Sequence, residues 1–263
     1  MIRLIATDLD GTLLDDNKQI HSSYWEIHQR LTSQGVLFMA ASGRQYYNLL
    51  EQFDRIKDEI VFLAENGTFV KYKGEEILVN ELPLENARHF IKKGREVPDT
   101  DLILCGKNSA YVESRHEPFL KDASNYYRRL EVVDDLTKIE DTVLKVTLWD
   151  HKNAEFNAYP HFKSYQDDFK IAVAGDVWLD ITHKTASKGT AIEKIQERFG
   201  VSPDDTLVFG DYLNDLDMMG VGYHSYAMKN AHSKIIEISR FVTRSDNNNN
   251  GVVETIKELF GLI

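Results

Sequence analysis

The two ends of this chain alternate short apolar runs with amphipathic stretches, and this alternation constrains the fold more than any other feature. Short continuous apolar runs are typical of strands that are buried on both faces. They occur at residues 2–7, 36–41, 60–63, 206–209 and 225–228. The amphipathic stretches predict helices at about residues 23–34, 44–53, 187–199, 216–219 and 252–259. Strands and helices in this order predict an α/β fold with a doubly wound, Rossmann-like parallel sheet.

Local signals mark the limits of some of these elements. Ser23 and Glu26 match a capping box at the start of the first helix, and Gly35 is placed to end that helix. Residues 69–79 contain two apolar runs separated by a lysine and a glycine. This pattern predicts a hairpin that extends the sheet.

The middle of the chain, from about residue 83 to residue 183, is different, because strands are frequent there and helices are few. The strand patterns lie at residues 102–105, 110–112, 143–149, 170–174 and 178–182. The helical patterns lie at about residues 84–93, 118–127 and 154–166. A chain of 263 residues exceeds the usual size of one domain. We therefore predict an α/β core made of residues 1–82 and 184–263, interrupted by an inserted α+β domain of residues 83–183.

Composition narrows the classes of function. The net charge of −11 argues against a surface for nucleic acid or anionic membranes, but it allows a small anionic substrate beside a bound cation. The single Cys105 excludes an intrachain disulfide, and the nine histidines show no spacing typical of a zinc site. No stretch resembles a signal peptide or a membrane span. We therefore expect a cytoplasmic protein, with a monomer as the simplest state.

A pair of aspartates directly follows the first apolar run, in the sequence Asp8-Leu9-Asp10-Gly11-Thr12. Residues two apart in an extended chain point to the same side, so both carboxylates leave the carboxyl end of the strand together. Ligands bind at that end of open α/β sheets. Two carboxylates this close stay ionised only beside a cation, or one of them takes up a proton. The motif therefore indicates a Mg²⁺ site for phosphoryl transfer, although the same residues taken alone also fit a solvated turn.

Other polar residues follow the second predicted strand and begin a later helix. The Ser42 hydroxyl and the Gly43 amide could bind a phosphate oxygen, or Ser42 could cap a helix. Lys188 lies at a predicted helix start, where a cation is unfavourable against the helix dipole. A nearby cluster of aspartates or a phosphate would explain this placement, and so would exposure to solvent.

A further acidic cluster follows the predicted strand at residues 206–209. Asp211 comes directly after it, and Asn214 and Asp215 lie three and four residues further on. Mg²⁺ prefers oxygen ligands, typically one or two carboxylates together with waters and a substrate phosphate. Asp8, the Asp10 carbonyl and Asp211 would supply such ligands, with the other two residues in support.

Together these motifs resemble those of the haloacid-dehalogenase-like (HAD) phosphatases, and among them the Cof-type sugar-phosphate phosphatases with a type IIB cap. The resemblance covers essentially the whole chain. Its four motifs stand in order at Asp8 to Thr12, Ser42-Gly43-Arg44, Lys188-Gly189, and Gly210-Asp211 with Asn214-Asp215. Residues 65–67 and 227–231 match in addition. The run of asparagines at 247–250, which we expect to form a loop, departs from the mixed acidic residues that relatives usually carry.

The resemblance implies a role for each motif. It makes Asp8 the nucleophile that forms an aspartyl-phosphate, and Asp10 the general acid and then the general base. Lys188 completes the expected catalytic group by holding phosphoryl oxygens. The implied substrate contacts are Ser42, Gly43, Arg44, Asn66 and Asn214. The implied Mg²⁺ ligands are Asp8, Asp10 and Asp211, with Thr12 and Asp215 in support.

The resemblance also implies that the middle segment is a cap, which closes over the sheet end and contacts the leaving group. The expected substrate is a small phosphorylated metabolite, and sugar phosphates are the usual substrates of the family. Candidate cap contacts, which packing or surface exposure explains better, are Tyr111, Lys145, Trp149 and His183.

Two other functions fit part of the pattern. A phosphohexomutase of the same superfamily would share the nucleophile and the acid, and added sugar bisphosphate would stimulate its turnover. A non-catalytic, phosphate-sensing regulatory protein would use the acidic cluster as a phosphoacceptor, but it would not need Asp10 as a paired general acid. Phosphomonoester hydrolysis is therefore the favoured function, with the identity of the substrate left open.

Overall fold

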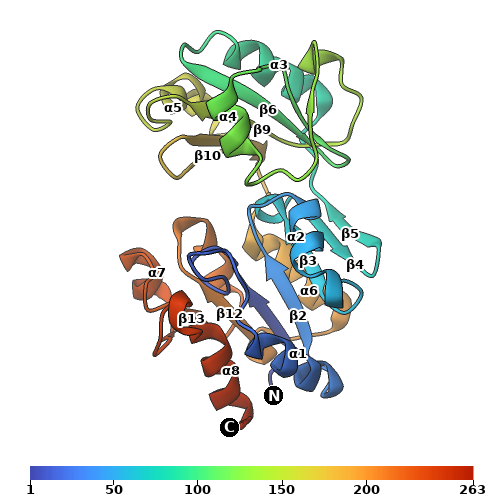
Figure 1. The fold of residues 1–263 in the computed structure, drawn as a ribbon, viewed down its shortest axis with the longest axis vertical. Helices are drawn as coiled ribbons and strands as arrows, with labels where there is room; N and C mark the ends of the chain where they lie inside the picture. Colours follow the sequence, from blue (N-terminus) through green and yellow to red (C-terminus); the bar gives the residue numbers. More distant parts are fainter. Residues whose placement is uncertain (263) are drawn as a thin grey trace. The chain divides into compact units, whose positions relative to one another are not determined.

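The computed structural model of the chain describes residues 1–262, so the predicted end of the core at residue 263 lies outside the described residues. Backbone contacts divide the chain into two compact units. The first unit contains residues 1–43 and 53–78 and the described residues from 187 onward. The second contains Arg44–Gln52 and Val79–Ala186. Each unit is built around its own sheet (Figure 1).

The first unit contains an eight-stranded sheet in the order β14-β13-β12-β1-β2-β3-β4-β5 (Figure 1). Strands β14 to β3 are parallel, and β4 pairs antiparallel with β3. The bounds are β1 Leu4–Thr7, β2 Leu37–Ala41, β3 Val61–Ala64, β4 Phe69–Tyr72, β5 Glu75–Val79, β12 Thr206–Gly210, β13 His224–Ala227 and β14 Phe241–Val242. The predicted parallel sheet is confirmed. Because β1 lies between β12 and β2, the carboxyl ends of these three strands meet at one edge of the sheet.

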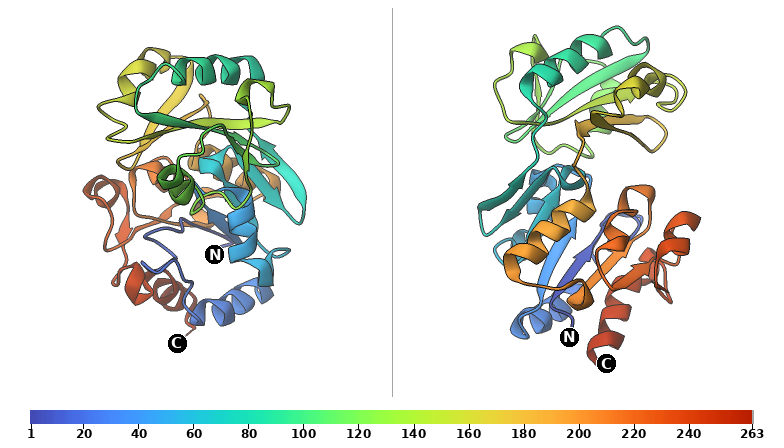
Figure 2. Two further views of the ribbon diagram at one scale, coloured as in Figure 1. Left: turned by 45° about the horizontal axis from the view of Figure 1, so that its top comes forward. Right: turned by 180° about the vertical axis from the view of Figure 1, so that it is seen from behind.

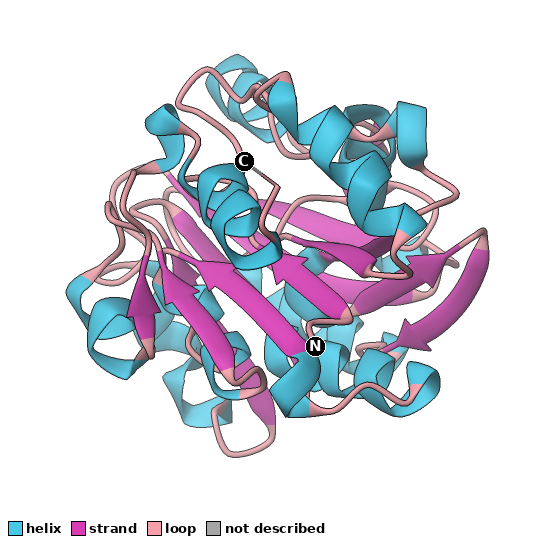
Figure 3. Cartoon of the chain, turned by 90° about the horizontal axis from the view of Figure 1, so that it is seen from below, coloured by secondary structure: helices cyan, strands magenta, loops and turns pink. Residues whose placement is uncertain are grey.

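Helices cover both faces of this sheet (Figure 3). They are α1 Ser23–Ser33, α6 Lys188–Phe199, α7 Ser233–Ile238 and α8 Gly251–Phe260. On one face, which α6 crosses (Figure 2), Ile192 belongs to the same buried cluster as Leu4 and Ala6 of β1. On the other face, Tyr24 of α1 meets Phe38 of β2 edge to face, with ring centroids 5.2 Å apart. Side chains alternate between the faces of a strand, so strands covered on both faces are apolar at every position.

The start of α1 differs from the prediction, because the capping box does not form. Ser22 is the N-cap residue, and its side chain makes no capping hydrogen bond. The hydroxyl of Ser23 pairs instead with His21 Nδ1 at 2.8 Å and accepts a hydrogen bond from Asn250 Nδ2 at 3.0 Å. These partners fix the start of the helix in place of the box.

The prediction of a helix around residues 216–219 is also wrong. The chain forms two short 3₁₀ turns there, Leu213–Asp215 and Met218–Gly220. The Asp215 carboxylate accepts hydrogen bonds from the backbone amides of Asp211 and Tyr212, at 2.9 and 3.2 Å. These bonds tighten the chain into a turn where the apolar spacing alone predicted a continuous helix. Helix α7 and strand β14 were absent from the prediction.

The second unit contains a six-stranded sheet in the order β10-β11-β9-β6-β7-β8. The strand bounds are β6 Thr100–Gly106, β7 Ala110–Val112, β8 Leu130–Val132, β9 Val143–Asp150, β10 Phe169–Ala174 and β11 Trp178–His183. The helices are α2 Tyr46–Gln52, α3 Leu84–Gly94, α4 Glu117–Ala123 and α5 Ala158–Phe162. Only β7 and β8 pair in parallel among the strand pairs described for this sheet. Its mixture of strands and helices is the predicted α+β architecture.

Each face of this second sheet has its own buried cluster. On one face, which α3 covers (Figure 2), Phe90 packs with Phe162 of α5 and with strand residues such as Val146. On the other face, Phe119 of α4 packs with Ile103 of β6. Burying side chains of this size stabilises a fold by roughly 1.5–3 kcal/mol each. The unit therefore has apolar packing on both sides of its sheet.

The helix predicted at residues 154–166 is much shorter than expected. Helix α5 is followed directly by the 3₁₀ turn Lys163–Tyr165. Pro160 lies in the first turn of α5, and a proline disfavours helix in the residues that precede it. Only the middle of the predicted range is therefore α-helical. Among the residues described, no helix is both long and apolar enough to cross a membrane.

Candidate active site

The residues after β1 and at the start of α6 meet in the interior of the first unit. Asp8 is only 5% exposed, and its backbone amide donates to Phe209 of the neighbouring strand β12. Lys188, the first residue of α6, is fully buried. Its ammonium donates to Asp8 Oδ1 at 2.5 Å and to Asp215 Oδ1 at 2.6 Å. Two carboxylates thus explain why a cation lies at a helix N-terminus, where the helix dipole opposes it.

Asp211 and Asp215 follow β12 and lie beside Asp8. One carboxylate oxygen from each of these three aspartates lies within 4.8 Å of the others. Asp211 Oδ1 accepts a hydrogen bond from the Thr12 hydroxyl at 2.9 Å. A Cβ added to Gly11 would stand 2.4 Å from Asp211 Oδ2, and the φ of Gly11 is +81°. Position 11 therefore needs glycine both for its backbone conformation and for the approach of this carboxylate.

The electrostatics of the cluster are unfavourable in the absence of a cation. Burial raises the pKa of Asp8 well above its ordinary value; Lys188 opposes this, and Asp215 and Asp211 add to it. Burial and the charge of Asp215 raise the pKa of Asp211 to about 6. The pKa of Lys188 is also raised, because the attraction of Asp215 and Asp8 outweighs the effect of burial. Lys188 therefore remains a cation, and the ionised aspartates exceed what it can neutralise.

The cluster has the donor set and the charge that suit a divalent cation. Three carboxylates and one ammonium leave a net charge of −2 when all four are ionised. Asp215 already accepts from Lys188 on one oxygen and from two backbone amides on the other. Both oxygens of Asp215 are thus engaged by protein donors, which makes Asp8 and Asp211 the better candidates for binding a cation. Hard divalent cations prefer such oxygen ligands.

The residues after β2 and β3 form a second part of the site. Ser42 is buried, and α2 begins four residues beyond it, so Ser42 does not cap that helix. The Ser42 carbonyl accepts a hydrogen bond from the backbone N–H of Asn66 at 3.0 Å. The side-chain oxygen of Asn66 accepts a hydrogen bond from Asn214 Nδ2 at 3.1 Å. A Cβ added to Gly43 would stand 3.0 Å from Asn66 Oδ1. Ser42, Gly43, Asn66 and Asn214 are therefore close neighbours.

Asn66 lies in a strained loop that contacts the start of α6. Glu65 and Asn66 both have positive φ values, 50° and 55°, which is unusual for residues other than glycine. A Cβ added to Gly67 would stand 2.1 Å from the Ser187 carbonyl oxygen, so the loop packs directly against the N-cap of α6. Strain of this kind persists where the surroundings fix a conformation, and it is frequent at functional sites.

The loop that carries Asp10 is held by residues far away in the sequence. The Asp10 carboxylate pairs with Lys18 at 2.9 Å and is about one-third exposed. The Gly11 carbonyl accepts from Asn230 Nδ2 at 2.8 Å, and Asn247 Nδ2 donates to the Leu14 carbonyl at 3.0 Å. The asparagine run at 247–250 is therefore not a plain loop, because it forms a 3₁₀ turn, Asn247–Asn249, that fastens the loop after β1.

The remaining predicted contacts belong to the second unit. Arg44 is grouped with that unit and lies just before α2. Lys145 is buried in an ion pair with Asp180, at 3.1 Å. Trp149 donates its indole hydrogen to Asp122 at 2.8 Å, and the Tyr111 hydroxyl donates to Asp141 at 3.1 Å. His183 Nδ1 pairs with the Thr185 hydroxyl at 3.0 Å. These partners are those expected of packing and structural hydrogen bonding.

Comparison with known proteins defines the family. Residues 5–256 match the haloacid dehalogenase-like hydrolase family. The chain is 32% identical to the 5-amino-6-(5-phospho-D-ribitylamino)uracil phosphatase YbjI of Escherichia coli, over 98% of this chain and 96% of that protein. A crystal structure from Eubacterium rectale superimposes with a TM-score of 0.89 at 28% identity, covering 98% of this chain and 99% of that one. A subclass IIB sugar phosphatase has the same fold, with a TM-score of 0.82 at 22% identity and coverage of 99% and 100%.

The parallel sheet and the acidic cluster at its carboxyl edge define an α/β protein with a candidate site for a divalent cation. More specifically, the chain belongs to the haloacid dehalogenase-like hydrolase family, and it is an enzyme of the phosphatase class. The family resemblance and the enzyme class predicted from the sequence are thereby confirmed.

Proposed function

We propose that the protein is a Mg²⁺-dependent phosphomonoester hydrolase that acts on small phosphorylated metabolites through an aspartyl-phosphate on Asp8. The observation that carries the proposal is the buried cluster of Asp8, Asp211, Asp215 and Lys188. Its excess negative charge suits a divalent cation, and the cation and Lys188 together suit a phosphoryl group.

In the proposed reaction, the Asp8 carboxylate attacks phosphorus while the bond from phosphorus to the leaving oxygen breaks. Asp10 donates a proton to that oxygen. Water then attacks the aspartyl-phosphate and gives its proton to Asp10, and the bond between phosphorus and Asp8 breaks to release phosphate. Lys188, the Ser42 hydroxyl and the Gly43 amide hold the phosphoryl oxygens. Bound Mg²⁺ would neutralise the phosphoryl group and align it for in-line attack, with Asp8, the Asp10 carbonyl and Asp211 as its ligands.

Sugar phosphates are the proposed substrate class, and the names of two relatives suggest a related sugar-alcohol phosphate to test. The Escherichia coli relative is named for a uracil that carries a phosphorylated ribitylamino group. A second relative, YitU from Bacillus subtilis, is named for the same phosphatase activity and is 26% identical over 98% of both chains. We propose residues 83–183 as the cap domain that selects among such substrates.

Phosphate release from a panel of substrates tests the proposal. The panel contains hexose and pentose phosphates, the phosphorylated ribitylaminouracil, nucleotides and p-nitrophenyl phosphate, each with Mg²⁺ and with EDTA. We expect release that requires the metal and is fastest for phosphorylated sugars or sugar alcohols. Folded protein that releases nothing would overturn the proposal, and turnover stimulated by added sugar bisphosphate would indicate a mutase.

Replacing Asp10 by asparagine should slow hydrolysis unequally. General acid catalysis typically contributes about 10²–10⁴-fold, and a poor alkoxide leaving group needs it most. We therefore expect a loss of that size on a hexose phosphate and a much smaller loss on p-nitrophenyl phosphate, measured as kcat/KM. Lys18→Ala is the control, because it removes the ion-pair partner of Asp10 and keeps its carboxyl group. Equal losses on both substrates in Asp10→Asn would refute the acid role.

Replacing Asp211 by asparagine should raise the Mg²⁺ concentration needed for half-maximal activity by about 10-fold or more. The change removes one charge from a cluster whose attraction for a cation depends on uncompensated carboxylates. Asp204→Asn is the matched control, because Asp204 is exposed and lies just before the opposite end of β12. An unchanged Mg²⁺ requirement in Asp211→Asn would remove this residue from the metal site.

A further inference from the structure

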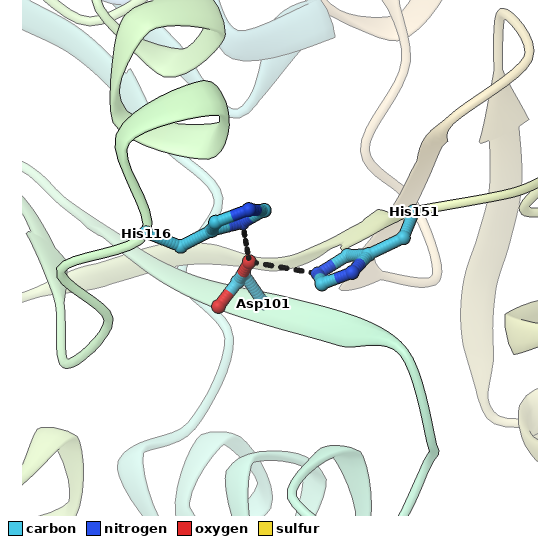
Figure 4. Close-up of side chains that lie close together, drawn as sticks. All are labelled: Asp101, His116 and His151. Atoms are coloured by element: carbon cyan, nitrogen blue, oxygen red, sulfur yellow. Dashed lines mark hydrogen bonds and ion pairs between the residues drawn. The ribbon is translucent and has the colours of Figure 1, made fainter.

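A second cluster of potential metal ligands lies within the second unit, well separated in sequence from the acidic motifs. It consists of Asp101 on β6, His116 just before α4 and His151 just after β9. His116 Nδ1 lies 3.2 Å and His151 Nε2 lies 3.0 Å from the same oxygen, Asp101 Oδ2. Figure 4 shows a ring nitrogen of each histidine directed at this carboxylate.

The three side chains are held in place by their surroundings. Asp101 lies opposite Trp149 in the antiparallel pairing of β6 and β9, and the Trp149 ring contacts both histidine rings, with centroids 5.9 Å and 5.1 Å away. The His151 amide donates to the Asp99 carbonyl at 2.9 Å. His116 is the N-cap residue of a helix whose first turn contains a proline. Such support fixes ligand orientation before any ion binds.

The cluster is open to solvent on its histidine side. The side chains of His116 and His151 are 40% and 35% exposed, whereas that of Asp101 is 12% exposed. The two imidazole rings lie nearly parallel, with centroids 4.9 Å apart. An ion can therefore reach the three ligand atoms directly, and it would keep at least one coordination position for water.

We propose that Asp101, His116 and His151 form a binding site for a divalent transition-metal ion of the zinc class. Zinc binds imidazole nitrogen and carboxylate oxygen at about 2.0–2.2 Å, which places neighbouring ligands of a tetrahedral site about 3.3 Å apart. The two separations from Asp101 Oδ2 are close to this value. Two imidazole ligands disfavour Mg²⁺ and Ca²⁺, which prefer oxygen. Three protein ligands leave the fourth tetrahedral position open.

Binding at this site would connect three separate elements of the second unit. The ligands come from β6, from the N-terminus of α4 and from the end of β9. An ion that binds only the folded state stabilises it in proportion to the logarithm of its concentration over Kd. Zn²⁺ should therefore stabilise the position of α4 against the sheet. The proposal does not depend on the proposed phosphatase mechanism, because its residues and its test are separate from that site.

Calorimetric titration of Zn²⁺ into the full-length, tag-free protein tests the site. Saturating Mg²⁺ is present throughout to compete for the Asp8 cluster. We expect one Zn²⁺ equivalent that His116→Ala and His151→Ala each weaken by about 100-fold or more, since even residues that only support a metal ligand contribute 10–100-fold. His161→Ala is the matched control, because His161 is an exposed histidine of the same unit outside the cluster, and it should bind like the wild type.

Two further measurements keep the outcome decisive. Asp101→Asn keeps the shape of the side chain and should also weaken binding, so it replaces either alanine variant that fails to fold by circular dichroism. Co²⁺ added to the wild type should give the visible absorption of a tetrahedral site, and Asp101→Asn should lose it. Identical isotherms for the wild type and all three cluster variants would overturn the proposal. So would a wild-type protein that binds no Zn²⁺ in the presence of saturating Mg²⁺.

Discussion

Replacing Asp8 by asparagine is expected to abolish phosphate release while leaving the protein folded. An amide cannot attack phosphorus as a carboxylate does, so the proposed aspartyl-phosphate cannot form. Disabling a residue of a catalytic unit typically lowers kcat by roughly 10⁴-fold or more. We expect a loss of at least this size on every substrate of the panel, in contrast to Asp10→Asn, whose effect depends on the leaving group.

The same substitution has an expected effect on stability that separates chemistry from folding. The pKa of Asp8 is raised in the folded protein, so its ionised form is disfavoured there at neutral pH when no metal is bound. Asparagine removes that unfavourable charge, and Lys188 keeps its bond to Asp215. The metal-free variant should therefore melt at a temperature at least as high as the metal-free wild type, and Mg²⁺ should raise its Tm less.

Activity and thermal unfolding of Asp8→Asn are measured beside Asp204→Asn, which changes an exposed aspartate at the other end of the same sheet. The control should retain wild-type turnover. Substantial activity in Asp8→Asn would show that another group attacks phosphorus. A large drop in its melting temperature would instead mean that the variant loses activity because it unfolds. The assignment of Asp8 to the active site would then rest on the metal dependence alone.

The sequence predicted most of both sheets because burial on both faces leaves a continuous apolar pattern. Strands β1, β2 and β12 are examples, each buried at nearly every position. The missed strand β8 has no such pattern, since Leu130 is half-buried and the next two residues are exposed. Strand β14 has only two residues, both exposed. Edge strands of this kind form through backbone pairing, which side-chain patterns do not record.

The site motifs were predictable in a similar way, because parallel strands bring their carboxyl ends to one edge. That rule places Asp8 and Asp211 side by side without knowledge of any contact. It does not predict that the Asn230 side chain donates a hydrogen bond to the Gly11 carbonyl in the loop after β1. The Asp101 cluster was beyond sequence reasoning as well, because its histidines lie 15 and 50 residues from the aspartate. The pairing of β6 with β9 brings His151 close to Asp101, and the packing of α4 on the sheet adds His116.

Replacing Lys188 by methionine is expected to destabilise the metal-free protein strongly. The ammonium is fully buried between Asp8 and Asp215, and methionine has a similar shape without the charge. Removing one partner from a buried ion pair typically costs about 3–5 kcal/mol, because the remaining charges lose their compensation. For a protein of this size, such a loss lowers the melting temperature by roughly 10 °C.

Magnesium should restore much of this stability but little of the activity. A divalent cation can neutralise the carboxylates that Lys188 leaves behind, so Mg²⁺ should raise the Tm of Lys188→Met more than that of the wild type. Turnover at saturating Mg²⁺ should still fall by about 10²–10³-fold, because the phosphoryl oxygens lose a cation that the metal does not replace. Lys194→Met, on the exposed side of the same helix, is the matched control and should change neither quantity appreciably. Equal melting temperatures for the two variants without metal would mean that Lys188 does not compensate the buried aspartates, and a fully active Lys188→Met would remove Lys188 from phosphoryl binding.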